Sequence, residues 1–141
     1  MGEKAVFEVS WEQHSVGIKT VRTAVFIEEQ GVSQALEFDG LDLSCSHWLA
    51  FDPAGQPIGT ARMLADGHIG RMAVLADHRQ RGLGKQIMET IIASAASYGH
   101  QRLHLHAQLT AVPFYSRLEF AEYGVEFMDA GMAHIAMALK L

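Results

Sequence analysis

The stretch between residues 68 and 107 limits the folds open to this chain more than any other part of it. Leu83, Ile87, Ile91 and Ala95 recur every four residues, with Met88 and Ile92 beside them, which is the buried stripe of an amphipathic helix. A strand pattern precedes this helix at His68–Val74, and a strictly alternating strand pattern follows it at Leu103–Ala107. A helix of this length between two strands predicts a right-handed crossover that joins parallel strands. The chain therefore belongs to the α/β class.

Antiparallel strands are predicted on the amino-terminal side of this unit. Turns at Asp52–Gly55 and Ala65–Gly67 separate strand patterns at His47–Phe51, Ile58–Leu64 and His68–Val74, which predicts hairpins. A first strand is expected at Ala5–Val9. Ser15 is expected to cap a helix that runs to about Glu29, and residues 32–46 to form a loop or an irregular helix.

A short helix is expected over Val112–Leu118, where Pro113 suits a first turn, and Gly99 is expected to cap the long helix. Strand patterns at Tyr123–Phe127 and His134–Ala138 close the chain. The sequence thus predicts a single domain over residues 1–141, with a mixed, mainly antiparallel sheet of about seven strands and flanking helices.

Composition excludes several classes of protein. Hydrophobic residues make up 49% of the chain and charged residues 19%, which is incompatible with global disorder. Eleven Lys and Arg against sixteen Asp and Glu give a net charge of −5, so no nucleic-acid partner is expected. No apolar run is long enough to cross a membrane, and no membrane partner is expected. The single cysteine, Cys45, is expected to be a reduced, buried thiol, and the expected location is the cytoplasm.

A basic, glycine-containing loop leads into the long helix. Its residues are Arg79, Gln80, Arg81, Gly82, Leu83, Gly84 and Lys85. A helix amino terminus presents unpaired N–H groups and the positive end of the dipole, where phosphates bind readily. Glycines allow the backbone to come close to such a group. The loop is therefore predicted to bind a pyrophosphate, although a loop that merely turns the chain would also have this composition.

Two common phosphate-binding motifs do not match this loop. The Walker motif requires Ser or Thr after its Gly-Lys pair, but Gln86 follows Gly84 and Lys85. The dinucleotide fingerprint requires a third glycine, where this chain has Ile87.

The pattern Arg79-x-x-Gly82-x-Gly84, placed after the strand Arg71–Val74, resembles the acyl-CoA signature of the GNAT acetyltransferase superfamily. Further segments resemble its small ElaA-like bacterial branch; these are Gln108, Ala111, Phe114-Tyr115, Val25–Gln30, Glu37-x-Asp39-x-x-Asp42 and Gly131–Ile135. One departure is Glu119, which stands where the family usually has Gly before Phe. The resemblance covers nearly the whole chain, so we expect a GNAT-like sheet with splayed central strands.

The resemblance implies acetyl-CoA as the cosubstrate. The backbone of Met72, Ala73 and Val74 would then pair with the pantetheine arm like an added strand, and the amides of residues 80–85 would hold the pyrophosphate. Gln108 and Phe114 are expected beside the same cosubstrate. The implied reaction is direct transfer of an acetyl group to a primary amine.

Tyr115 is the expected general acid, because a phenol stays protonated at pH 7 and can protonate the departing thiolate. Glu28 and Glu29 are the expected candidates for the general base, with Glu37, Asp39 and His47 as further candidates. These carboxylates and the negative net charge favour a cationic acceptor, which is either a small molecule or a peptide amine.

Alternatives to the enzyme remain at this stage. A non-catalytic acyl-CoA sensor would keep the same loop, and an interaction protein would keep the fold alone. His104 and His106 lie two apart on one strand and so share a face, but no third ligand is evident and no metal is expected. Arg62 and Arg71 are expected to pair with the acidic loop. The oligomeric state stays open, with a homodimer through the final strands as the form that the family suggests.

Overall fold

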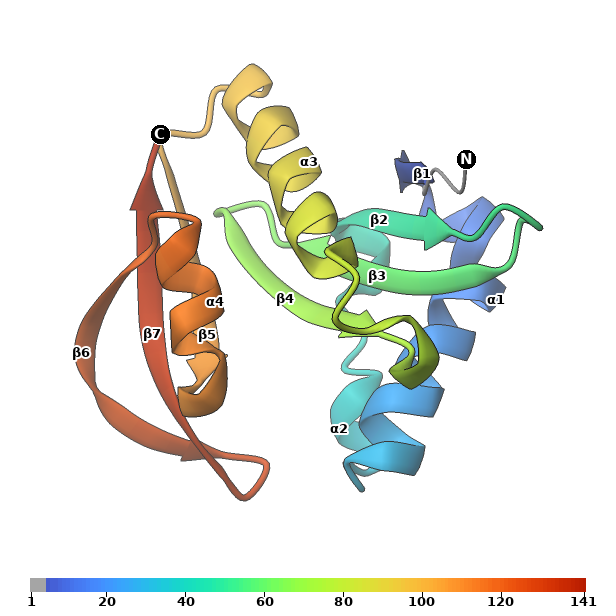
Figure 1. The fold of residues 1–141 in the computed structure, drawn as a ribbon, viewed down its shortest axis with the longest axis horizontal. Coiled ribbons are helices and arrows are strands. Elements are labelled where there is room, and N and C mark those ends of the chain that lie inside the picture. The colour runs from blue at the N-terminus through green and yellow to red at the C-terminus, as the bar shows by residue number, and fades with distance from the viewer. Residues whose placement is uncertain (1–4) are drawn as a thin grey trace.

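A computed structural model describes residues 5–141 and contains one seven-stranded sheet of order β1-β2-β3-β4-β5-β7-β6 (Figure 1). The strands, in chain order, are β1 Ala5–Val9, β2 Ser46–Phe51, β3 Pro57–Met63, β4 His68–Val74, β5 Arg102–Gln108, β6 Ala121–Asp129 and β7 Met132–Lys140. All neighbouring strands are antiparallel except the central pair, β4 and β5. The predicted mixed, mainly antiparallel sheet is confirmed.

The first helical segment begins earlier than the sequence analysis expected. Helix α1 spans Trp11–Arg22, and the hydroxyl of Ser10, not of Ser15, caps it by accepting a hydrogen bond from the Gln13 N–H at 3.3 Å. Ser10 followed by Gln13 is the spacing of a capping box, which the apolar pattern further along the chain obscured. The prediction of a Ser15 cap was therefore wrong, because Ser15 lies inside the helix.

The end of this segment agrees with the expected position near Glu29 but has different helical geometry. Residues Thr23–Glu29 form a π-helix, in which the Gln30 N–H donates to the carbonyl of Val25, five residues back, at 3.0 Å. Short π-helical stretches are rare and often lie at functional sites. The expected irregular region follows, with helix α2 at Gln34–Glu37 and a 3-10 turn at Asp42–Ser44.

Helix α3, Leu83–Ser97, provides much of the core. Its buried face consists of the predicted stripe of Leu83, Ile87, Met88, Ile91 and Ala95, packed on the sheet on the face opposite α1 (Figure 1). The predicted cap is confirmed, since Gly99 has φ +89° and the His100 N–H donates back to the Ala95 carbonyl at 3.0 Å. Across the described residues 5–141, each helix is too short or too polar to pass through a bilayer.

The centre of the sheet opens into two halves. Strands β4 and β5 are paired only at His68 with His104 and at Ile69 with Leu105, and beyond these positions the two strands diverge (Figure 1). The register of β4 against β3 shifts at the same place, so that two residues of β4 lie opposite one residue of β3. Arg71, in this β-bulge, has φ +51°. The expected splayed central strands are therefore present.

Helix α4, Val112–Arg117, ends in a Schellman motif that lacks the usual glycine. The Phe120 N–H donates to the Tyr115 carbonyl at 3.1 Å, and the Glu119 N–H donates to the Ser116 carbonyl at 3.0 Å. Glu119 takes the left-handed conformation with φ +73°, and the Tyr115 and Phe120 rings meet at 6.0 Å. The turn thus keeps its shape despite the departure from the family sequence, and it fixes the position of Tyr115.

Replacing Glu119 by Gly is expected to stabilise the protein by about 0.5–1 kcal/mol, because a left-handed residue with a Cβ costs roughly 1–2 kcal/mol and the added backbone entropy of glycine offsets part of the gain. Urea unfolding of the Glu119→Gly variant would measure the change. Glu122→Gly, in the exposed strand that follows, is the matched control and is expected to destabilise. Equal stability losses for both variants would contradict the idea that position 119 is strained.

Candidate active site

A cavity of about 420 Å³ lies where β4 and β5 part. Side chains and backbone from four regions line it: the end of the first helical segment with α2, strand β4, strand β5 with the start of α4, and the hairpin between β6 and β7. The lining includes Arg71 and Met72 of β4, Gln108 of β5, Tyr115 of α4, and the histidines His68, His106 and His134 of β4, β5 and β7. Strands β4 and β5 and helix α4, which the sequence analysis connected with the acyl donor and with Tyr115, therefore meet at this cavity.

The basic loop ends beside this cavity, at the amino terminus of α3. Gly82, with φ +79°, is the N-cap residue of α3. The first hydrogen bond of the helix runs from the Gln86 N–H to the Gly82 carbonyl, at 3.1 Å. Helix geometry leaves the amides of Leu83, Gly84 and Lys85 without acceptors inside the helix. A Cβ built on Gly84 would lie 3.4 Å from the Phe114 ring and 4.0 Å from the Met72 methyl. The amino terminus of α3 therefore packs closely against α4 and β4 at Gly84, where there is no side chain to separate them.

Arg79 connects this loop to the end of the first helical segment. Its two terminal nitrogens each donate to one carboxylate oxygen of Glu29 at 2.6 Å, and its Nε donates to the Val74 carbonyl at 2.9 Å. The hydrogen bonds from Arg79 hold the pKa of Glu29 below its ordinary value. From this segment Phe26 and Gln30 line the cavity, whereas the exposed Glu28 and Glu29 lie outside it.

Tyr115 lines the cavity from α4. Its ring contacts those of Phe114 at 5.0 Å and Phe120 at 6.0 Å between centroids, so two aromatic neighbours fix its orientation. Burial raises the pKa of Tyr115 to about 12. Within residues 5–141, no side chain or backbone group accepts or donates a hydrogen bond at its hydroxyl. The phenol is therefore protonated at neutral pH and is available to a ligand in the cavity.

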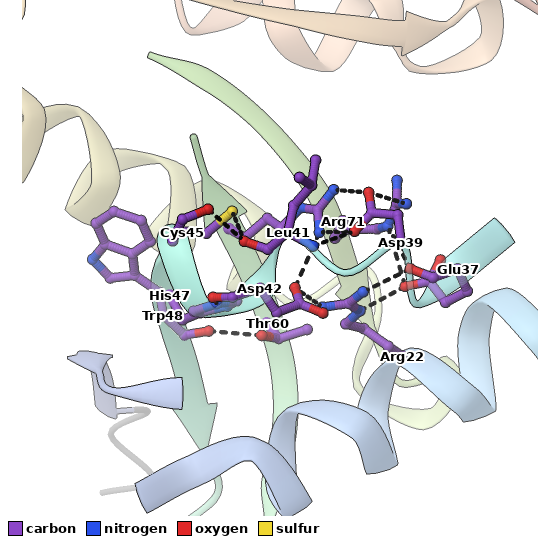
Figure 2. A network of polar contacts seen from close by, with 12 residues as sticks. Arg22, Glu37, Asp39, Leu41, Asp42, Cys45, His47, Trp48, Thr60 and Arg71 are labelled. Atoms are coloured by element: carbon purple, nitrogen blue, oxygen red, sulfur yellow. Dashed lines mark hydrogen bonds and ion pairs between the residues drawn. The ribbon is translucent and has the colours of Figure 1, made fainter. Parts of the chain in front are cut away.

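A buried network of arginines and carboxylates supports one wall of the cavity (Figure 2). Arg22 is fully buried; its Nε donates to Glu37 at 2.5 Å and its Nη1 donates to Asp42 at 2.7 Å. The same Asp42 oxygen accepts from Arg62 at 3.0 Å. Burial raises the pKa of Glu37 against the attraction of these arginines. Sequence reasoning missed Arg22, because a cation on an otherwise apolar helix face is usually solvent-exposed.

The expected pairing of Arg62 and Arg71 with the acidic loop is confirmed. Arg62 binds both oxygens of Asp39, at 2.6 and 2.9 Å, and Arg71 binds Asp39 at 3.2 Å. The hydrogen bonds from Arg62 hold the pKa of Asp39 far below its usual range. Glu37 and Asp39 therefore serve as structural counter-ions, which leaves neither carboxylate unpaired to act as a base.

His47, the remaining candidate base, is fully buried outside the cavity lining. Its Nε2 donates to the Asp42 carbonyl at 2.7 Å, and its ring lies 5.2 Å from that of Trp11. Burial lowers the pKa of His47. It holds the acidic loop in place and has no contact with the opening between the strands.

The sequence pattern indicated that His104 and His106 share a face, but not that they cluster with His68 and His134 from the neighbouring strands. His68 Nδ1 lies 3.1 Å from His104 Nδ1, and the His68 and His106 rings are 4.8 Å apart. His106 also meets Phe127, whose ring is stacked on His134 at 5.8 Å. The rings of His104 and His106 are thus covered by His68 and, for His106, by Phe127.

A sheet that opens beneath a helix amino terminus, with a protonated phenol in the opening, is the architecture of an acyl-CoA-dependent transferase. Comparison with known proteins agrees with this class: residues 11–141 match the acetyltransferase (GNAT) domain family. The chain therefore belongs to the GNAT acetyltransferases, which are acetyl-CoA-dependent N-acetyltransferases.

Individual relatives support the same assignment. The uncharacterized N-acetyltransferase YjcF of Bacillus subtilis is 36% identical over 121 residues, which cover 83% of this chain and 86% of that protein. The crystal structure of Escherichia coli ElaA superposes with a TM-score of 0.83 at 26% identity, covering 98% of this chain and 99% of ElaA. An acyl-CoA N-acyltransferase from Pseudomonas aeruginosa superposes with a TM-score of 0.82 at 26% identity, covering 98% and 99% of the two chains.

Proposed function

We propose that this protein transfers the acetyl group of acetyl-CoA directly to the primary amine of a cationic acceptor, with Tyr115 as the general acid. The observation that carries this proposal is that Tyr115 lines the cavity between β4 and β5 and that its hydroxyl has no hydrogen-bond partner within the described chain. The helix amides at Gly84 approach the same region from the other side.

The proposed cosubstrate fits two features of the chain. The amides of Leu83, Gly84 and Lys85 are oriented for a pyrophosphate, and Gly82 and Gln80, with positive φ, shape the loop that precedes them. The backbone of β4 from Met72 to Val74, which β5 leaves unpaired, supplies donors and acceptors for the amides of a pantetheine arm. Gln108 lines the cavity on the facing strand.

The chemistry requires a neutral amine, a polarised carbonyl and a proton for the departing sulfur. The amine nitrogen attacks the thioester carbon, the C–N bond forms, the C–S bond breaks, and the proton of the Tyr115 hydroxyl goes to sulfur. A thiol has an ordinary pKa of about 8.5, so a proton donor lowers the cost of releasing the thiolate. Tyr115 then recovers its proton from water.

The cavity supplies an argument about the acceptor. Arg71 is the cation of its lining, and the carboxylates of the buried Glu37 and the more exposed Asp39 compensate its charge. Asp129 lies at the rim as a carboxylate without a cationic partner among the described ion pairs. Negative potential at the opening favours the approach of a cationic amine.

Two measurements test the proposal together. At a concentration of about 100 times Kd, acetyl-CoA is expected to stabilise the protein by ~2.7 kcal/mol, which raises Tm by about 8 °C. Thiol release in a panel of cationic, neutral and anionic amines is expected to be fastest for the cationic members. Binding without turnover of any amine would favour a non-catalytic sensor, and turnover of anionic amines alone would overturn the acceptor class.

Gly84→Val is expected to weaken acetyl-CoA binding by at least about tenfold, which is roughly 1.4 kcal/mol. A branched side chain at this position would collide with the Phe114 ring, since even a Cβ lies 3.4 Å from it. Gly84→Ala is the matched control, because a methyl group is in ordinary contact there, and its affinity should stay within about threefold of the parent. Isothermal calorimetry checks both, and equal affinities for both variants would contradict the proposed binding site.

A further inference from the structure

The acidic side chains of the first helical segment lie outside the cavity, so they cannot take the proton that the acceptor loses. His68 lines the cavity at the point where β4 and β5 separate. A Cβ built on Gly70 would lie 3.9 and 4.0 Å from its Cδ2 and Nε2 atoms, so this edge of the ring faces along β4 toward the opening. Its opposite edge, at Nδ1, is turned toward His104.

We infer that His68, His104 and Asp66 form a proton path that carries the acceptor's proton from the cavity to solvent. This inference rests on the proposed acetyl transfer. In it His68 is the group that takes the proton, and His104 and Asp66 are positioning residues that receive it and pass it on.

The hydrogen-bond geometry fixes the direction of this path. Asp66 Oδ1 accepts from the backbone N–H of His68 at 3.0 Å, which orients the carboxylate so that Oδ2 lies 3.6 Å from His104 Nε2. This separation is longer than a hydrogen bond, and it is the charge of the carboxylate that favours the tautomer of His104 with its proton on Nε2. The Nδ1 atom of His104 is then an acceptor, so the 3.1 Å contact requires His68 to donate from its own Nδ1. The Nε2 atom of His68 is left with a lone pair on the cavity side.

Proton transfer along this path balances. The acceptor nitrogen, directly or through one water, gives its proton to His68 Nε2 as the C–N bond forms. His68 Nδ1 gives its proton to His104 Nδ1, and His104 Nε2 releases its proton toward Asp66 and bulk water. The side chain of Asp66 is 70% exposed, so the path ends in solvent. Proton exchange with water then restores the starting tautomers.

The surroundings of His68 keep it neutral and therefore able to accept. The charged and titratable groups facing it are His104 and His106 on β5, Asp66 in the preceding turn, and Arg62 on β3. Burial, reinforced by His106 and His104, lowers the pKa of His68 to about 4. An imidazole with this pKa binds a proton only briefly at neutral pH, so it can transfer the proton to His104 and does not remain charged.

The kinetics of two variants test the path, with thiol release as the signal. Spermidine is the acceptor; if no amine of the panel is acetylated, hydrolysis by water is measured in its place. His68→Gln is expected to lower kcat by about 100-fold with KM for acetyl-CoA within about twofold of the parent. His104→Asn keeps an acceptor for His68 Nδ1 but cannot transmit a proton, and a loss of about tenfold in kcat is expected. His14→Gln, on α1, is the matched control and should be unchanged.

Full activity of His104→Asn would overturn the path, because a merely structural role is satisfied by an amide at that position. Full activity of His68→Gln would overturn the role of His68. Acetyl-CoA-induced stabilisation is measured on the same samples, so a protein that does not bind acetyl-CoA refutes the proposed function, whereas a binding protein with unchanged kcat refutes the path alone.

A spectroscopic measurement needs neither an acceptor nor a variant. In ¹⁵N-labelled protein at pH 7, ring nitrogen shifts are expected to show the proton of His68 on Nδ1 and that of His104 on Nε2. His68 is expected to remain neutral down to about pH 5, given a pKa of about 4. The opposite tautomer pair, or an imidazolium at His68 at pH 7, would overturn the inference.

Discussion

Tyr115→Phe is expected to reduce kcat for acetyl transfer by about 10²- to 10⁴-fold, while acetyl-CoA still binds with parental affinity. The substitution removes only the hydroxyl of a cavity-lining residue, and this hydroxyl has no hydrogen-bond partner within residues 5–141. The ring contacts with Phe114 and Phe120 are retained, so the Schellman turn and the cavity wall keep their shape. Steady-state assays with thiol detection, together with calorimetric titration of acetyl-CoA, measure the two parts of this prediction.

Tyr98→Phe is the matched control. Tyr98 is exposed at the end of α3 and its hydroxyl donates to Glu8, far from the opening of the sheet, so its loss should leave kcat unchanged. Because the pKa of Tyr115 is raised to about 12, the parent should show no loss of rate from ionisation of this phenol below about pH 10. Parental turnover of Tyr115→Phe would remove the residue from the mechanism.

Arg22→Met is expected to destabilise the protein by about 3–5 kcal/mol, the cost of leaving buried carboxylates without their partner. Arg22 is fully buried and binds Glu37 and Asp42 within one cluster. Lys19→Met, one turn earlier on the exposed face of α1, is the matched control and should change stability by less than about 0.5 kcal/mol. Urea unfolding at neutral pH measures both.

The stability lost in Arg22→Met should depend on pH, in a direction set by the titration of Glu37. Burial already raises the pKa of Glu37, and removing Arg22 raises it further above the unfolded value. A carboxyl whose folded pKa is raised favours the folded state when protonated, so its contribution is retained at low pH and is lost as pH rises through the folded pKa. Arg22→Met should therefore be less destabilising at pH 5 than at pH 8. A pH-independent loss would show that repacking, not charge, causes the effect.

Local patterns predicted the order of the elements because each one depends on near neighbours in the chain. The stripe of α3, its Gly99 cap and the alternation in β5 are set by residues three to four or two positions apart. The resemblance in the basic loop similarly placed Gly82 and Gly84 at a helix start, where the structure has them. Ser10 was missed although its capping spacing was present in the sequence.

The parts that could not be predicted depend on contacts distant in sequence. Arg22 meets carboxylates fifteen and twenty residues away, and only the folded loop brings them together. His106 and His134 lie on neighbouring strands because β7 inserts between β5 and β6. Periodicity contains no information about that order. The same limitation made Glu28 and Glu29 attractive candidates, because no local pattern indicates that the π-helix leaves them outside the cavity.

The seam between β4 and β5, with two paired positions, divides the sheet into a four-stranded plate and a three-stranded plate that meet at a corner. On the proposed function, a donor seated along the open edges acts as a temporary strand and joins the plates into one rigid body. Binding of the acyl donor would then both stiffen the sheet and supply the group to be transferred. Release of free coenzyme would loosen the corner again, which couples the turnover of the enzyme to the stiffness of its own scaffold.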